Sequence, residues 1–469
     1  MSMVKTIAAL TVRLSVRSGA LPIACAVVTL LLWLASFSAY RHQQAQSQQR
    51  DFYARTVRSQ WLDQPDRHPH RASHYGYMAF RVGSPLGFFD RGVDTFAGTA
   101  IFLEAHRQNP ANFSEAGQSA ATVRLGELTP ALVLQAVAPL ILFFLGFAAV
   151  SGDRESGTLA MMLAQGAAPS TVMWGKALGL LAGTLMMVAP GLIAVLTLSV
   201  VSGGAAAARR AALLLAAYGL YLAICTLIAI LVSAWQTSSR ASLTALILIW
   251  VCGLVIMPRA LQAWGSSSWP APSRAQFDAL LEEDLEHTGD SHNPNDSHFA
   301  ALRAKVLAEY SVNRVEDLPF NYSALVMKES EAISSGIFAR HYGRLIGVFQ
   351  RQGAPLETAS LFNPFLAVRR ISMALAGSDL RHFIEFQKQA ESFRFELVQK
   401  LNELHLTEIQ QRNDRGQRVS RERWKDFPPF VYRAPSLGAV LREHWLALLS
   451  LAAWFAALSA AVCFRKVAR

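Results

Sequence analysis

Six long apolar runs restrict this chain to a membrane. They lie at 21–40, 130–150, 177–201, 211–234, 241–257 and 445–464. Most are close to the roughly 20 residues that an α-helix needs to cross a hydrocarbon layer about 30 Å thick. Hydrophobic residues make up 52% of the 469 residues and charged residues only 16%, too apolar a balance for a soluble protein of this size. We therefore predict an all-α polytopic membrane protein with six transmembrane helices.

The first apolar run is expected to remain in the mature protein. It follows an amphipathic segment with Lys5, Arg13 and Arg17, which could be the basic region of a signal peptide. However, the run at 21–40 has the length of a membrane span rather than that of a signal core. The segment before it is predicted to lie along the membrane surface.

Two long hydrophilic inserts interrupt the runs. The first is rich in turn residues and is expected to form a compact irregular lobe packed on the membrane, whereas the second has a mostly helical pattern. Pro258 is predicted to close the fifth span. The resulting division is 1–40 for a surface helix and the first span, 41–129 for the first insert, 130–257 for spans two to five, 258–443 for the larger insert and 444–469 for the last span and tail.

The polar segment between the second and third runs is short but carries a distinctive pattern. Asp153, Arg154 and Glu155 are predicted to lie just outside the membrane. Ser156 is expected to cap a short amphipathic helix, which Gly166 and Pro169 would end. The apolar side of this helix is formed by Leu159, Met161, Met162 and Leu163. Such a helix, lying at the mouth of two spans at 153–165, is predicted to be a docking element; the alternative is a solvated loop.

The run DRESGTL, followed by a small-residue break and Gly175-Lys176, resembles the cytoplasmic coupling segment of permeases in the type-2 ATP-binding-cassette (ABC) exporter family. Two other stretches, LGFFDRGVDTFAGTAIFLEAHRQN and NPFLAVRRISMALAGSDLRHF, resemble a subgroup of these permeases with large extracytoplasmic inserts.

This resemblance implies a coupling site and a set of partners. The implied coupling residues are Asp153, Arg154, Glu155, Gly157, Thr158, Leu159, Met162 and Leu163. Arg154 and Glu155 would make polar contacts with an ATPase, and the three apolar residues would seat in its groove. The implied assembly has two separate ABC ATPase subunits and a second permease copy or a sister permease. The chain itself is expected to hold no cofactor, because ATP and Mg would be bound by the partner ATPase.

Missing motifs exclude several other activities. The sequence contains no G-x-x-x-x-G-K-[ST] phosphate cradle, so the chain is not expected to hydrolyse ATP. It also contains no H-E-x-x-H and no G-x-S-x-G hydrolase motif. Charged residues are confined to the ends of the spans, which disfavours a proton-coupled carrier.

Neither cysteines nor histidines predict a metal site. All four cysteines lie in apolar runs. His68, His70 and His74 lack a neighbouring cysteine or spaced carboxylate that would complete a site. A second acidic and histidine-containing group is interpreted as a flexible polar loop; its members are Asp284, His287, Asp290, His292, Asp296 and His298.

Charge distribution predicts the orientation. Six spans place both termini on one side, where the short segments carry Lys5, Arg13, Arg17, Arg154, Lys176, Arg240, Arg465, Lys466 and Arg469. The excess of basic residues favours a cytoplasmic location for that side of a bacterial inner (plasma) membrane, with both inserts extracytoplasmic. The net charge of +11 includes no basic run of five or more, so membrane lipids are expected as contacts and nucleic acid is not.

Three functional hypotheses follow. The first is a permease that exports a substrate using ATP hydrolysed by its partners. The second is a mechanotransmission subunit, in which hydrolysis moves the extracytoplasmic domain and no cargo passes through the bundle. The third is a membrane-anchored receptor or enzyme that has no ATPase.

Overall fold

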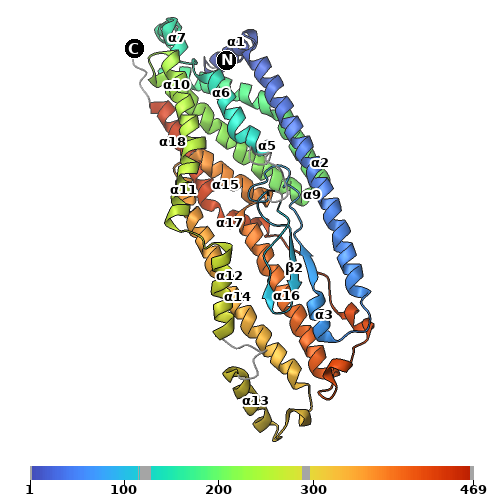
Figure 1. Cartoon of the computed structure of the whole chain (residues 1–469). Coiled ribbons are helices and arrows are strands. Elements are labelled where there is room, and N and C mark those ends of the chain that lie inside the picture. Colours follow the sequence, from blue (N-terminus) through green and yellow to red (C-terminus); the bar gives the residue numbers. More distant parts are fainter. Residues whose placement is uncertain (1–2, 115, 117–127, 288–295, 465–469) are drawn as a thin grey trace.

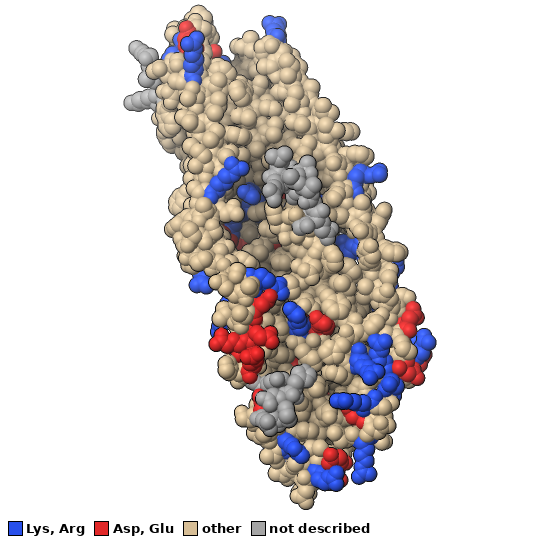
Figure 2. Space-filling model, in the orientation of Figure 1, with Lys and Arg blue, Asp and Glu red and all other residues tan. Residues whose placement is uncertain are grey.

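The computed structural model describes residues 3–114, 116, 128–287 and 296–464. A helical bundle forms one end of an elongated molecule, and a lobe that includes the small sheet, α14 and α16 forms the other (Figure 1). On the face shown in Figure 2, charged side chains of both signs gather over the lobe, whereas the bundle is nearly free of them between its ends. This distribution is the one that a membrane requires.

Five helical stretches are long and apolar enough to cross a membrane. They are α2 (Ala20–Leu62), Pro130–Glu155, α9 (Pro169–Trp235), Ser239–Ser268 and α18 (Trp445–Phe464). The second stretch comprises α5 (Pro130–Leu132), the π-helical turn η2 (Val133–Val137), α6 (Ala138–Gly146) and α7 (Ser151–Glu155).

The 67-residue α9 is in fact two helices. Gly203 and Gly204 have non-helical backbone angles, and Gly204 has a φ of 59°. A Cβ at Gly146 would lie 2.6 Å from Leu180 Cδ2 and 3.1 Å from Ala229 Cβ, so both arms of α9 pack beside α6. Counted as two arms, α9 brings the spanning segments among the described residues to six. The prediction of an all-α polytopic membrane protein is confirmed.

Glycines let the first helices approach α9 closely. Helix α1 (Met3–Arg17) contacts α9 at Gly175, where an added Cβ would lie only 2.6 Å from Ile7 Cβ. Helix α2 contacts α9 at Gly191, where an added Cβ would lie only 2.5 Å from Leu32 Cβ. Only a hydrogen atom fits at these positions, so the backbones can pack together.

The sequence predicted that the fifth span ends at Pro258, but the helix continues past this residue. Helix α10 (Ser239–Trp250) continues through a π-helical segment, η3 (Val251–Ile256), into α11 (Met257–Ser268). In a π turn the Gly253 carbonyl would accept a hydrogen bond from the N–H of residue 258, but proline has none. Asn363 Nδ2 donates to this carbonyl instead, at 2.9 Å. The widened turn and its distant donor allow the helix to pass the proline.

The lobe contains a small sheet that the sequence did not predict. Strands β1 (Tyr77–Phe80), β2 (Ala100–Glu104) and β3 (Arg107–Gln108) form an antiparallel sheet in the order β1-β2-β3, with Tyr77 opposite Leu103. Helix α3 (Pro69–Tyr75) precedes β1. The sheet packs against the outer half of α2 through a buried cluster that includes Trp61, Tyr77, Trp424 and Phe427.

The second insert is mostly helical, as its sequence pattern predicted. Ser273 Oγ accepts from Gln276 N at the start of α12 (Arg274–His287), and Asp296 Oδ1 accepts from His298 N at the start of α13 (Ser297–Glu309). The rest of the lobe and its return to the bundle comprise η4 (Val315–Asp317), α14 (Tyr322–Ala359), α15 (Pro364–Ala376), α16 (Leu380–Glu408), η5 (Asp414–Gly416), η6 (Arg421–Asp426) and α17 (Leu437–Glu443).

Candidate functional site

The polar segment between the second and third spans forms a hairpin of two short helices at the end of the bundle (Figure 1). Helix α7 is followed by α8 (Thr158–Ala164). Ser156 does not cap α8, contrary to the prediction, because it ends α7 and donates its N–H to Gly152 O. Gly157 makes the turn with a φ of 73°, and nothing lies within 4 Å of a Cβ there. Pro169 starts α9 rather than ending α8.

Glu155 joins the hairpin to the start of α10. Its two carboxylate oxygens accept hydrogen bonds from the Ser239 N–H, at 2.8 Å, and from the Ser239 Oγ, at 2.7 Å. These hydrogen bonds hold the pKa of the Glu155 carboxyl below its usual range. A carboxylate at a helix N-terminus also interacts favourably with the unpaired N–H groups there.

Arg154 joins the hairpin to the end of α9. One guanidinium nitrogen donates to Gln236 O at 2.5 Å and the other to Ala234 O at 3.0 Å. A cation that binds the last carbonyls of a helix satisfies acceptors that have no partner within the helix. Arg154 and Glu155 therefore hold both sides of the turn between the fourth and fifth spans.

Asp153 joins the hairpin to the third span. Its carboxylate lies 2.6 Å from Lys176 Nζ, and the side chains are only 18% and 10% exposed, respectively. The Ser233 hydroxyl also accepts from the N–H groups of Val150 and Ser151 at 3.0 Å. Through these contacts, the hairpin is fixed to both arms of α9 and to α10.

Helix α8 turns much of its apolar side toward the bundle. Leu159 is 4% exposed and belongs to the same buried cluster as Val150, and Met162 and Leu163 are half-buried against that cluster. Leu159 is thus committed to the chain's own core, which corrects its expected position in a partner's groove. Met161, at 60% exposure, is the large apolar side chain on the outward face. It is flanked there by Ala160, Ala164 and Gln165.

The other predicted coupling residues lie at the turn. Gly157 is exposed and Thr158 is half-buried. The Thr158 hydroxyl lies 2.8 Å from that of Ser156, across the left-handed glycine. The structure thus gathers all eight predicted residues in one hairpin, and Asp153, Arg154 and Glu155 all bind the chain's own helices, although Glu155 stays exposed.

A buried polar chain links the first insert to the bundle, and sequence reasoning missed it. Gln135 donates to the Tyr218 hydroxyl at 2.7 Å, Tyr218 donates to Ser372 at 2.8 Å, and Ser372 donates to Asp90 at 2.5 Å. Burial raises the pKa of the Asp90 carboxyl. The four residues come from η2, α9, α15 and the loop before β2, so no local pattern could have predicted the grouping.

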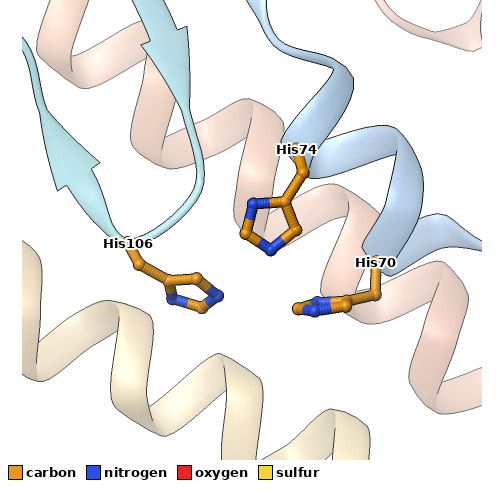
Figure 3. Close-up of side chains that lie close together, drawn as sticks. All are labelled: His70, His74 and His106. Carbon is orange, nitrogen blue, oxygen red and sulfur yellow. The ribbon is translucent and has the colours of Figure 1, made fainter.

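Histidines gather at two places in the lobe. His70 and His74 of α3 meet His106 from the turn between β2 and β3 (Figure 3), and ligand-capable atoms of the three lie within 4.8 Å of one another. Burial, and then the neighbouring His74 and His106, lower the pKa of His70 to about 4. The second group joins His68 to His405 and Asp414. His68, His70 and His74 are close together in the sequence, but the fold places His68 in a different group from the other two.

The second sequence cluster does not form a site among its described members. Asp284 pairs with His341 of α14 at 2.7 Å, and His298 lies 3.4 Å from Glu329. Asp296 caps α13. Asp290 and His292 lie outside the described residues.

Six spanning segments and a polar hairpin fixed to three of them define a multi-pass membrane protein that presents a short helix outside the bundle. A family model described as "ABC-2 family transporter protein" matches residues 5–282, more than half of the chain. The chain belongs to this family, and it is therefore a membrane subunit of an ABC transporter that associates with ABC ATPase subunits.

The matched residues include the hairpin and the first five spans. A second model, described as "Domain of unknown function (DUF3526)", matches residues 274–433, which contain α12 to α16. A comparison with curated proteins found no significant match. The first model thus covers the membrane part of the chain up to residue 282, and the second, which covers most of the lobe, gives it no function.

Proposed function

We propose that the chain is the permease of an ABC exporter in a bacterial inner membrane, with the hairpin cytoplasmic and the lobe extracytoplasmic. Two ATPase subunits would bind ATP and Mg, and a second permease copy or a sister permease would complete the bundle. The substrate would cross the membrane between the permeases.

The fixation of the hairpin carries this proposal. Asp153 binds Lys176 in the third span, Arg154 binds Ala234 and Gln236 at the end of the fourth, and Glu155 binds Ser239 at the start of the fifth. A force that the ATPase applies to α8 would therefore move three spans together. In this proposal, Gly157 and Thr158 form the turn through which this force passes from α8 to α7.

The contact face for the ATPase would be the outward side of α8, centred on Met161, with Met162 and Leu163 at its edge. Leu159 would support this face from below. Position-specific photo-crosslinking tests the assignment. A photoreactive residue at 161 should capture the ATPase in membranes, whereas one at Met257, another exposed methionine, should not. Equal capture at both positions, or capture at 257 alone, would reject the assigned face.

Orientation is tested separately. A Met161→Cys variant, expressed without the ATPase in a chain whose four native cysteines are replaced, should react with a membrane-impermeant thiol reagent in inverted vesicles and stay unlabelled in intact spheroplasts. Labelling in intact spheroplasts would place the hairpin beyond the reach of cytoplasmic ATP and overturn the proposal.

One observation favours mechanotransmission as a second candidate. Helix α2 has 43 residues, so it is about 65 Å long, about twice the hydrocarbon thickness. Near its far end Trp61 is 1% exposed and donates to Trp424 O at 3.1 Å in the lobe core. Tilting of the first span would therefore move the lobe directly.

Uptake of candidate cargo into inverted vesicles separates the two functions. ATP-dependent accumulation would support export. Spin labels on α2 and on α13 that report an ATP-dependent change in distance, with no accumulation of any cargo, would support mechanotransmission instead.

A further inference from the structure

We propose that His70, His74 and His106 bind one divalent transition-metal ion, in a site that depends on neither candidate function. The three rings converge from two elements that are 30 or more residues apart in the sequence (Figure 3). Imidazole is a ligand that suits Zn²⁺, Cu²⁺ and Ni²⁺. Three such ligands leave a fourth position for water or for a ligand from another molecule.

His70 and His74 stand one helical turn apart on α3. This spacing puts both side chains on the same face of the helix. The helix is held in place by His68, whose Nδ1 accepts from the His70 N–H at 3.2 Å, and by the buried residues Ala72 and Ser73. The His70 and His74 ring centres are 4.7 Å apart. Among the described residues, the buried Nδ1 of His70 has no hydrogen-bond partner.

His106 is positioned by a carboxylate behind its ring. Its backbone φ is 63°, a conformation that non-glycine residues adopt rarely, and its N–H donates to Glu331 Oε2 at 2.9 Å. The same oxygen lies 3.4 Å from the ring Nδ1. A carboxylate at one ring nitrogen fixes the tautomer and makes the other nitrogen a better metal ligand. The strained turn and its buried acceptor thus present His106 Nε2 as the ligand atom.

The charge around this support favours a cation. Glu331 is fully buried and pairs with Arg394 at 2.5 Å, and Arg394 also pairs with Glu391 at 2.7 Å. Of these charged groups, the Glu331 carboxylate is the one that contacts His106, so a negative charge lies directly beside one of the proposed ligands.

The spacing of the nitrogens requires only a small adjustment. Their separations are within 4.8 Å, while a tetrahedral site with Zn–N bonds of about 2.1 Å has nitrogens about 3.4 Å apart. Rotation of the imidazoles about χ2 supplies a closure of this size, because that torsion is soft.

The neighbouring group of His68, His405 and Asp414 differs, because its carboxylate already has hydrogen-bond partners within the chain. Asp414 Oδ1 lies 2.6 Å from His405 Nε2, accepts from Asn321 Nδ2 at 2.7 Å, and lies 3.5 Å from His68 Nε2. The hydrogen bond to His68 Nδ1 described above also occupies that ring. This group is therefore a structural network, and it is not included in the proposed metal site.

Zinc binding to the purified, tag-free full-length chain tests the proposal. After chelation, the wild type should take up one Zn²⁺ per chain, and its Co²⁺ form should show the visible absorption of a four-coordinate ion. His74→Gln removes an exposed ligand, and His106→Asn keeps a residue that tolerates a positive φ. Each should weaken Zn²⁺ binding by more than about tenfold, because loss of even an outer partner of a ligand costs about 10–100-fold.

The matched control is His298→Gln, which alters an exposed histidine of the same lobe. It should bind Zn²⁺ as the wild type does, and Zn²⁺ should raise the melting temperature of both. Far-UV circular dichroism of the apo forms checks that His74→Gln and His106→Asn are folded. Equal Zn²⁺ affinity in the wild type and in these two variants, or no binding by the folded wild type, would overturn the site.

Discussion

Glu155 of α7 accepts two hydrogen bonds from Ser239, the first residue of α10. The interaction crosses from the end of the second span to the start of the fifth. The charged residues of the hairpin thus bind the chain's own helices, so a force on the hairpin would reach the bundle through these contacts as well as through the backbone.

Replacement of Glu155 by Ala should loosen this turn without unfolding the bundle. Both hydrogen bonds would be lost, so amide exchange at 236–242 should accelerate, and ATP hydrolysis in the complex should become less well coupled to transport or lobe movement. Ser239→Ala should have a smaller effect, because the backbone N–H still donates. The double variant should behave as Glu155→Ala alone, since the two residues act through one contact. Glu283→Gln on α12 is the control, and additive effects would contradict the pairing.

Lys176→Met should destabilise the bundle, because it leaves the largely buried Asp153 carboxylate without its charge partner. Loss of one member of a buried pair costs about 3 kcal/mol or more. Asp153→Leu combined with Lys176→Met should recover much of the loss, since no buried charge remains. Thermal unfolding in detergent measures both effects, and a double variant as unstable as Lys176→Met would count against this explanation.

Trp61→Ala should disconnect the lobe from α2. Its side chain is 1% exposed and packs among Tyr77, Trp424 and Phe427. Truncation of a buried tryptophan costs about 3–5 kcal/mol. Limited proteolysis should cut the lobe faster, while the ATPase should still co-purify because the hairpin is untouched. Loss of ATPase binding would indicate that the lobe and the hairpin fold as one unit.

Asn363→Ala should be costly in part because residue 258 is a proline. The substitution removes the donor to the Gly253 carbonyl and the cap that accepts from Phe365 N at 2.9 Å. An unsatisfied buried group costs about 1–3 kcal/mol. Pro258→Ala restores an N–H to the helix, so it should reduce the cost of Asn363→Ala in a double-variant cycle measured by thermal unfolding. An equal cost in the two backgrounds would contradict this role for Asn363.

Length and apolarity were enough to predict the spans, because a membrane leaves few alternatives to a long apolar helix. A helix start with a side-chain cap, such as Ser273 before α12, was also predictable, since a cap acts within three residues. The passage of a helix through Pro258 was not, because its compensating donor is 110 residues away in the sequence.

The hairpin was predictable as a polar segment between two spans but not in its orientation. A helix of two turns has too few residues for its sequence to show whether its apolar side faces the chain's own bundle or a partner protein. Leu159 was therefore predicted to contact a partner, although it lies in the chain's own core. The histidine site was also out of reach, because only the pairing of β2 with β3 brings His106 to α3.

The glycine pair that divides α9 has a mechanical consequence. A methyl group at Gly203 would lie 2.7 Å from Pro85 Cγ, in the loop between β1 and β2. The connection between the third and fourth spans is thus in direct contact with the loop of the lobe that carries Pro85. Replacing Gly203 with alanine would push this loop away from the bundle, independently of any change at the opposite end of those spans.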